Sequence, residues 1–131
     1  MSESHAVAAG HALTARTASD VLEAGGSAMD AAFAAALTAM VAEPVLAGVL
    51  GGGFAMVREP GGRCRLLDAF VQTPAAKRPE GETDLREIHA DFGSATQGFH
   101  IGAGTIAASG LAAGLAEAHA RYGRMDRREL A

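Results

Sequence analysis

The sequence predicts an α+β fold, because apolar runs with helical spacing alternate with short β-type runs separated by glycine-rich turns. Apolar residues make up 49% of the 131 residues, which is enough for a packed core. Aromatic residues contribute only 5% and tryptophan is absent, so alanine and glycine supply much of the apolar content. We therefore expect closely approaching backbones, and the length leaves room for a single domain over residues 1–131.

Two helices are expected in the first third of the chain. Leu13–Ala24 carries apolar residues at helical spacing. Ser27, followed three residues later by Asp30, is a variant of the capping box that begins helices. The run Ala28–Ala42 that follows is apolar nearly all round, and Pro44 cannot continue it. We expect this second helix to be covered on most sides.

Short strands are expected around this helical pair. Val7–Gly10 could form one strand ahead of it. Phe54–Val57 and Leu66–Val71 flank the turn Pro60-Gly61-Gly62, which predicts a β-hairpin with a glycine-rich approach. Gln97–Ala108 has the composition of one or two strands interrupted by glycine.

The remaining segments predict a loop and three helical stretches. Residues 73–83 are rich in proline and charge, so we expect a solvated loop; Thr83 or Asp84 could then cap a short helix through His89. Ser109 is expected to cap a helix that Gly123 closes. Residues 126–131 resemble the first turn of another helix.

Composition and charge argue against several classes of partner. Fifteen acidic and eleven basic residues give a net charge of −4, and the basic residues form no stripe, so we expect no nucleic acid partner. The uncharged runs are too short or too broken by glycine to span a bilayer, so we expect no membrane association. Residues 1–5 lack the features of a secretory leader, and Cys64 has no cysteine partner, which predicts a cytoplasmic protein.

No motif for a metal or a cofactor is visible. Gly51-Gly52-Gly53 precedes a strand and lacks the Gly-Lys-Ser/Thr ending of a phosphate cradle, so a tight turn beside a buried strand explains it better. Ser109 lacks the glycine of a nucleophile elbow. The histidines have no metal-ligand spacing, and the loop carboxylates favour solvated or capping roles. These residues are His5, His11, His89, His100 and His119, and Asp68, Asp84 and Asp91. We expect no metal and no cofactor.

Five blocks of sequence nevertheless occur in a recognisable order. They are His11–Leu13, Val21–Ala32, Glu43-Pro44, Gly51–Phe54 and Gly114–Met125. Their order and spacing resemble the N-terminal segment of the large subunit of gamma-glutamyltransferases. The block Ala-Gly-Gly-Ser-Ala-Met-Asp-Ala-Ala within the second is the most specific of them.

The resemblance implies an N-terminal-nucleophile hydrolase, a four-layer αββα sandwich of which this chain would form an incomplete N-terminal part. Such enzymes are made as precursors that cut themselves to expose a catalytic threonine. That threonine would lie outside this chain, so no catalytic residue is expected here and the chain alone should be inactive. The expected partners are the remainder of the enzyme or a nucleophile-bearing small subunit, with a small acyl amide or peptide as substrate.

One departure from the family pattern concerns substrate binding. Family members typically carry Asp-Phe-Arg-Glu, whose arginine grips the glutamyl α-carboxylate, where this chain has Asp68-Ala69-Phe70-Val71. By resemblance, Phe70 and Val71 are the expected substrate-binding residues. Loss of a guanidinium removes a charge-assisted pairing and would favour an uncharged acyl group over glutathione. The alternative is that Phe70 and Val71 only pack a core in an inactive relative.

Three functions stay open at this point. The chain could be part of a gamma-glutamyltransferase-like amidohydrolase or acyltransferase, for a gamma-glutamyl or related acyl group. It could instead be a non-catalytic subunit or pseudoenzyme module that pairs with a separate chain. A small-ligand-binding domain built on the glycine-rich turn is the third reading.

Overall fold

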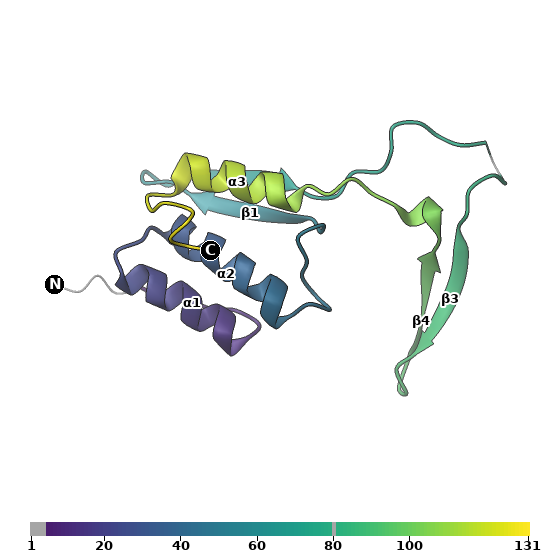
Figure 1. Cartoon of the computed structure of the whole chain (residues 1–131), viewed down its shortest axis with the longest axis horizontal. Coiled ribbons are helices and arrows are strands. Elements are labelled where there is room, and N and C mark those ends of the chain that lie inside the picture. Colours follow the sequence, from purple (N-terminus) through teal and green to yellow (C-terminus); the bar gives the residue numbers. More distant parts are fainter. Residues whose placement is uncertain (1–4, 80) are drawn as a thin grey trace. The chain divides into compact units, whose positions relative to one another are not determined.

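The computed structural model describes residues 5–79 and 81–131, which divide into two compact units (Figure 1). The first unit runs to Phe70 and includes residues 109–131, and the second spans Val71–Ala108. The three α-helices of the described residues lie in the first unit and each unit contains a pair of strands, so the α+β class is confirmed. The expectation of a single partial domain stays a prediction.

Helices α1 (Ala12–Glu23) and α2 (Ala28–Ala42) form the pair expected at the start of the chain. The imidazole Nδ1 of His11 accepts a hydrogen bond from the Leu13 amide, which caps α1. The capping box of α2 is complete: Ser27 Oγ accepts from the Asp30 amide, and Asp30 Oδ2 accepts from the Ser27 amide. Local capping chemistry therefore fixes where both helices begin.

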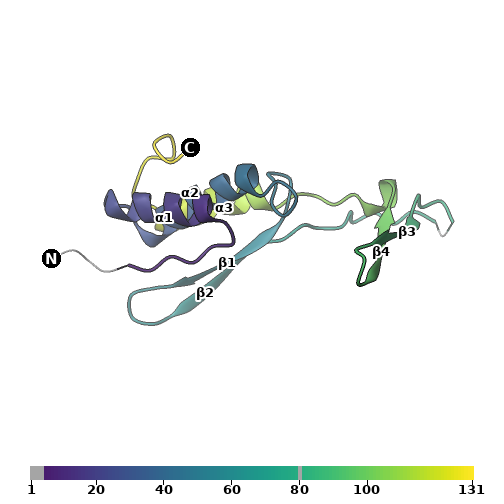
Figure 2. The same ribbon diagram turned by 90° about the horizontal axis from the view of Figure 1, so that it is seen from below.

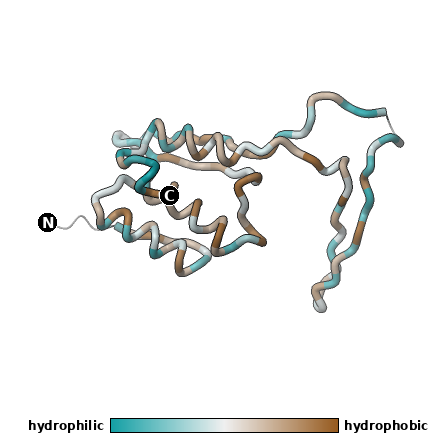
Figure 3. Tube along the Cα trace, in the orientation of Figure 1, coloured by the Kyte–Doolittle hydropathy of each residue, from teal (hydrophilic) through white to brown (hydrophobic). Residues whose placement is uncertain are grey.

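The covering of α2 differs from expectation. Its buried residues, Ala31, Phe33 and Ala34 with Asp30, all lie in its first half. Towards its end Val41 is 82% exposed, and the segment after it also leaves Val45 and Leu46 exposed. Figure 3 shows the hydrophobic colouring of α2 and of the segment that follows it. Within the described residues the second half of α2 is half-buried, and Val41 is its one exposed position.

Strands β1 (Gly53–Arg58) and β2 (Cys64–Ala69) form the predicted antiparallel hairpin. The register pairs Gly53 with Ala69 at one end and Arg58 with Cys64 at the turn. Carboxylate oxygens of Glu59 lie 2.8 Å from Nε of Arg63 and 2.6 Å from Nε of Arg65, and one also accepts from the Tyr122 hydroxyl. Hydrogen bonds from Arg63 and Arg65 lower the pKa of Glu59.

Helix α3 (Leu111–Tyr122) packs on this hairpin through backbone contact. A Cβ atom on Gly114 would lie 2.1 Å from the Ala69 Cβ, and one on Gly110 would lie 2.5 Å from the Ala69 carbonyl oxygen. Only glycine allows α3 to approach β2 this closely. Figure 2 shows the three helices in one layer with the hairpin along one side.

The ends of α3 differ from the predicted ones. Gly110 is the N-cap and no side chain caps the helix. Ser109 Oγ donates instead to the Gly51 carbonyl oxygen at 3.0 Å, because the glycine-rich segment before β1 brings that oxygen within reach. Gly123 ends the helix as expected, but in an extended conformation with φ −73°. Its lack of a side chain makes room for His119, whose Nε2 would lie 2.5 Å from an added Cβ.

The second unit contains strands β3 (Arg86–Asp91) and β4 (Thr96–Ile101), paired antiparallel, and the short 3-10 helix η1 (Ala103–Thr105). The predicted helix from Thr83 or Asp84 through His89 is therefore wrong. Ile88 pairs with Phe99 across the hairpin. The pairing of the two strands satisfies the backbone N–H and C=O groups that a helix would have satisfied internally.

The strands predicted over Gln97–Ala108 are present in part. Gly102 has φ +115°, which ends β4 and leads into η1, and Ala108 pairs only with Gln72 through an isolated bridge. The three carboxylates predicted at loops and strand ends all accept backbone amides: Asp68 from Phe70, Asp84 from Ala103 and Asp91 from Gly93. Their predicted capping roles are confirmed.

One of the two terminal predictions is wrong. Residues 7–10 are irregular and form no strand, since they pair with no other strand in the described chain. Residues 126–131 do form a turn with helix-like backbone bonds, in which Glu129 donates to the Asp126 carbonyl, Leu130 donates to the Arg127 carbonyl, and Asp126 Oδ1 accepts the Arg128 amide. That turn places Leu130 in the core beside Phe33 and Ala34. Among the helices of residues 5–79 and 81–131, none is long and apolar enough to cross a membrane.

The α3–hairpin contact gives a first prediction. Gly114→Ala should destabilise the protein by about 2 kcal/mol, because overpacking against Ala69 outweighs the helix propensity of alanine, worth up to about 1 kcal/mol. Gly48→Ala is the matched control, since a Cβ there would meet nothing within 4 Å. Thermal unfolding of the two variants provides the measurement. Equal melting temperatures would contradict the close packing.

Candidate functional site

The expected substrate-binding residue Phe70 lies directly after β2 and forms an aromatic pair with Phe54 of β1. The ring centroids are 5.3 Å apart and the planes differ by 8°, so the rings are stacked. Both remain exposed, Phe54 to 60% and Phe70 to 49%. The pair therefore presents a flat apolar surface at the open end of the hairpin, opposite its turn.

Val71, the other expected substrate-binding residue, is half-buried and begins the second unit. It lies outside β2, and the next residue, Gln72, makes the bridge to Ala108. Its role in binding stays a prediction, as does that of Phe70. Phe54 is not among the residues predicted to bind substrate, although it directly follows Gly51-Gly52-Gly53 in the resembling block.

The glycine-rich segment presents carbonyl oxygens to the start of α3. The Gly51 oxygen accepts from Ser109 Oγ at 3.0 Å and from the Leu111 amide at 3.1 Å. An anion site would need converging amides instead. The segment thus serves as a close-packed approach to β1.

A hollow of about 900 Å³ lies within the first unit between α2, α3 and the hairpin. Its lining is mainly apolar and includes Phe33 from α2, Phe54 and Met56 from β1, and Leu111 and Leu115 from α3. Phe54 therefore both lines this hollow and stacks on Phe70. Within residues 5–79 and 81–131, no group of three metal-ligating side chains occurs.

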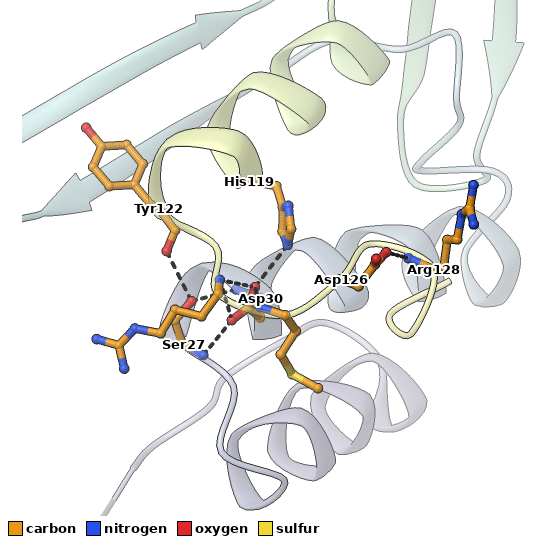
Figure 4. Close-up of polar contacts among 8 residues, drawn as sticks. Ser27, Asp30, His119, Tyr122, Asp126 and Arg128 are labelled. Atoms are coloured by element: carbon orange, nitrogen blue, oxygen red, sulfur yellow. Dashed lines mark hydrogen bonds and ion pairs between the residues drawn. The ribbon is translucent and has the colours of Figure 1, made fainter.

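Asp30 is the polar centre of the first unit, and its side chain is fully buried (0% exposed). Its oxygens accept from the Ser27 amide at 2.7 Å, the Arg124 amide at 3.0 and 3.1 Å, and the Met125 amide at 3.3 Å. Ser27 Oγ also donates to the Tyr122 carbonyl. Figure 4 shows the end of α3 and the turn after it converging on this carboxylate.

His119 approaches the same carboxylate from α3. Its Nε2 lies 2.9 Å from Asp30 Oδ1, and its ring lies 4.9 Å from the ring of Phe33. His119 Nε2 makes no hydrogen bond in this geometry, so the contact is a close approach of the two side chains. Neither Asp30 nor His119 lines either of the two cavities described for residues 5–79 and 81–131. We assign Asp30 and His119 a structural role.

Burial raises the pKa of Asp30, but the hydrogen bonds from Ser27, Arg124 and Met125 outweigh it and leave the pKa below its ordinary value. The charged form is therefore favoured in the folded state. A carboxyl group of this kind stabilises the fold above its unfolded pKa, and that stabilisation is lost as pH falls through the lower folded pKa.

Comparison with known proteins identifies the family to which the chain belongs. The sequence profile described as gamma-glutamyltranspeptidase matches residues 14–131. This chain belongs to the gamma-glutamyltranspeptidase family. The expected family is thereby confirmed.

Two curated relatives illustrate the range of this family. The acylase ACY 1 proenzyme of Pseudomonas sp. (strain SE83) is 33% identical over 125 residues, which is 95% of this chain and 22% of the relative. The glutathione hydrolase proenzyme of Bacillus subtilis (strain 168) is 32% identical over 128 residues, 95% of this chain and 21% of the relative. The chain thus spans about a fifth of the length of these family members.

A solved gamma-glutamyltranspeptidase from Pseudomonas nitroreducens, complexed with L-DON, has the same fold over 98% of this chain and 36% of its own. The TM-score is 0.77 and the identity 30%. The gamma-glutamyltranspeptidase of Helicobacter pylori matches with a TM-score of 0.73 at 22% identity, which shows the fold alone. The predicted fold class, part of an αββα N-terminal-nucleophile hydrolase sandwich, is confirmed by this likeness.

The Asp30 cluster gives a second prediction. Asp30→Asn should lower the free energy of unfolding of the protein by about 3 kcal/mol at neutral pH, because it removes a buried charge-assisted hydrogen-bond centre. It should also flatten the loss of stability as pH falls below the ordinary pKa of an aspartate, because the wild-type carboxylate, whose pKa is lowered, takes up its proton there.

Asp20→Asn is the control for this change. Asp20 is exposed and lies 3.8 Å from Arg16, so its removal should cost less than about 1 kcal/mol. Denaturant unfolding across this pH range measures both variants. If the free energy of unfolding of the Asp30 variant fell at low pH as steeply as that of the wild type, the cluster would not be stabilising the fold.

Proposed function

We propose that this chain contributes one wall of the acyl pocket in a gamma-glutamyltransferase-like amidohydrolase or acyltransferase. The nucleophile in this proposal is a threonine outside these 131 residues, freed by self-cleavage of a precursor. Its hydroxyl attacks the amide carbonyl, the amine leaves, and an acyl ester forms. Water or a second amine then takes the acyl group and restores the hydroxyl.

The observation that carries the proposal is the match of residues 14–131 to the family profile, together with the shared fold. Relatives with this segment include an acylase and a glutathione hydrolase, and both are described as proenzymes. A proenzyme name agrees with activation by cleavage. The partner in the proposal is the remainder of the enzyme or a small subunit bearing the nucleophile.

Phe70 and Val71 are the proposed acyl-contacting residues. The ring of Phe70 is 49% exposed within its unit, so it is available to contact an acyl group. Lack of a guanidinium at position 70 makes a gamma-glutamyl carboxylate a poor fit, so glutathione is a doubtful substrate.

The natural protein should therefore cleave acyl amides, whereas the isolated 131-residue chain should not. Self-cleavage should give two fragments on a denaturing gel, and mass spectrometry should place a threonine at the new N-terminus. Release of an aromatic amine from acyl anilides measures turnover. Turnover by the purified 131-residue chain, free of host enzymes, would overturn the proposal.

The isolated chain should also bind a hydrophobic fluorescent dye, because Val41, Val45, Leu46 and Leu50 are all more than 80% exposed. Replacing Val45 and Leu46 by serine should reduce that fluorescence; Ser94→Ala, at an exposed turn of the second unit, serves as control. A cooperative, monodisperse melt without dye binding would instead favour the non-catalytic module.

A further inference from the structure

We propose that Phe54 and Phe70 together form an aromatic face that selects an uncharged, apolar acyl group, with Phe54 as a second specificity-determining residue. This inference rests on the proposed function. It names a substrate class, an acyl group with a flat apolar end such as an aryl-acetyl group. It also adds a residue from a different strand to the acyl wall.

The geometry of the pair suits a flat ligand. In the register, Phe54 stands opposite Asp68, two residues before Phe70. The Phe70 amide donates to Asp68 Oδ1 at 2.9 Å, which bends the chain just after β2 and lets the ring lie on Phe54. Two nearly parallel, exposed rings offer edges and outer faces to a third planar group.

The backbone beneath the pair is held in place. A Cβ on Gly110 would lie 2.5 Å from the Ala69 carbonyl oxygen and 2.6 Å from that of Phe70, so the start of α3 lies directly against these two residues. Gly114 makes the second close contact to Ala69. An aromatic surface held in this way loses little conformational freedom when a ligand binds.

The charges near the pair disfavour an acyl group that carries a carboxylate. Asp68 stands directly opposite Phe54 in the register, so an acidic side chain lies beside the pair. The hairpin's arginines lie towards its turn: Arg65 stands opposite Val57, about 10 Å along the strands from Phe54, and Arg58 pairs with Cys64 next to the turn. Arg63 and Arg65 are engaged with Glu59. A glutamyl carboxylate at the two rings would therefore lie next to an acidic residue, whereas an apolar group would contact the rings without that charge.

The test compares two anilides that share one leaving group, phenylacetyl anilide and gamma-glutamyl anilide, on the natural, self-cleaved protein. Wild type should prefer the phenylacetyl substrate. Phe54→Ala should lower kcat/KM for it about tenfold and should lower the ratio of the phenylacetyl to the gamma-glutamyl kcat/KM. Phe70→Arg should shift the ratio of the two kcat/KM values towards gamma-glutamyl by at least tenfold.

Phe92→Ala is the matched control, because Phe92 is an equally exposed phenylalanine of the second unit that contacts Phe99. It should leave the ratio unchanged. Phe54→Leu keeps an apolar side chain of similar bulk but has no flat face, so it should also lower the phenylacetyl rate. It serves as the test if the alanine variant fails to fold. Self-cleavage and melting temperature report folding for every variant.

The outcomes separate the two proposals. A wild-type protein that cleaves neither anilide and never cuts itself would overturn the proposed function. An active protein that prefers gamma-glutamyl anilide, or whose ratio is the same in wild type, Phe54→Ala and Phe54→Leu, would overturn the aromatic face while leaving the proposed function standing.

Discussion

The buried carboxylate of Asp30 is the interaction on which the first unit depends. It closes the capping box at the start of α2 and also accepts the amides of Arg124 and Met125, which follow α3. One side chain thus accepts hydrogen bonds both from a free amide at the start of a helix and from the amides of an irregular turn. Since α1 packs on α2, and α3 packs on the hairpin, this carboxylate joins both halves of the unit.

Small residues carry the rest of the packing. The core contains Ala18, Ala31, Ala34 and Ala118, and glycines at 110 and 114 bring α3 into backbone contact with β2. Contacts of this kind are short and leave little room for adjustment, because no flexible side chain can move aside. They hold residues 69 and 70 firmly, and in this way a small-residue helix controls where an exposed aromatic ring sits.

Local sequence signals were sufficient for the helices and the first hairpin. Ser27 and Asp30 are three residues apart, and Pro60-Gly61-Gly62 lies between its two strands, so each signal is read within a few residues. Strand β3 was missed because Arg86–Asp91 gains its conformation from pairing with β4. The alternation of Ile88 and Ala90 with polar neighbours was the available signal.

The site was only partly predictable for the same reason. Phe70 was found through resemblance at one position, but its stacking on Phe54 depends on the strand register, which no local motif gives. Asp30 was identified as a cap, whereas its contact with His119 and its bonds to Arg124 and Met125 join residues about 90 positions apart.

That separation has a consequence for synthesis on the ribosome. The α1–α2 pair can fold as soon as Ala42 has emerged, because its contacts are local. Its buried carboxylate, however, lacks two of its amide donors until Met125 has left the exit tunnel. During the intervening translation Asp30 has only water and Ser27 as partners, and the nascent helical pair stays open to solvent at the surface that α3 later closes.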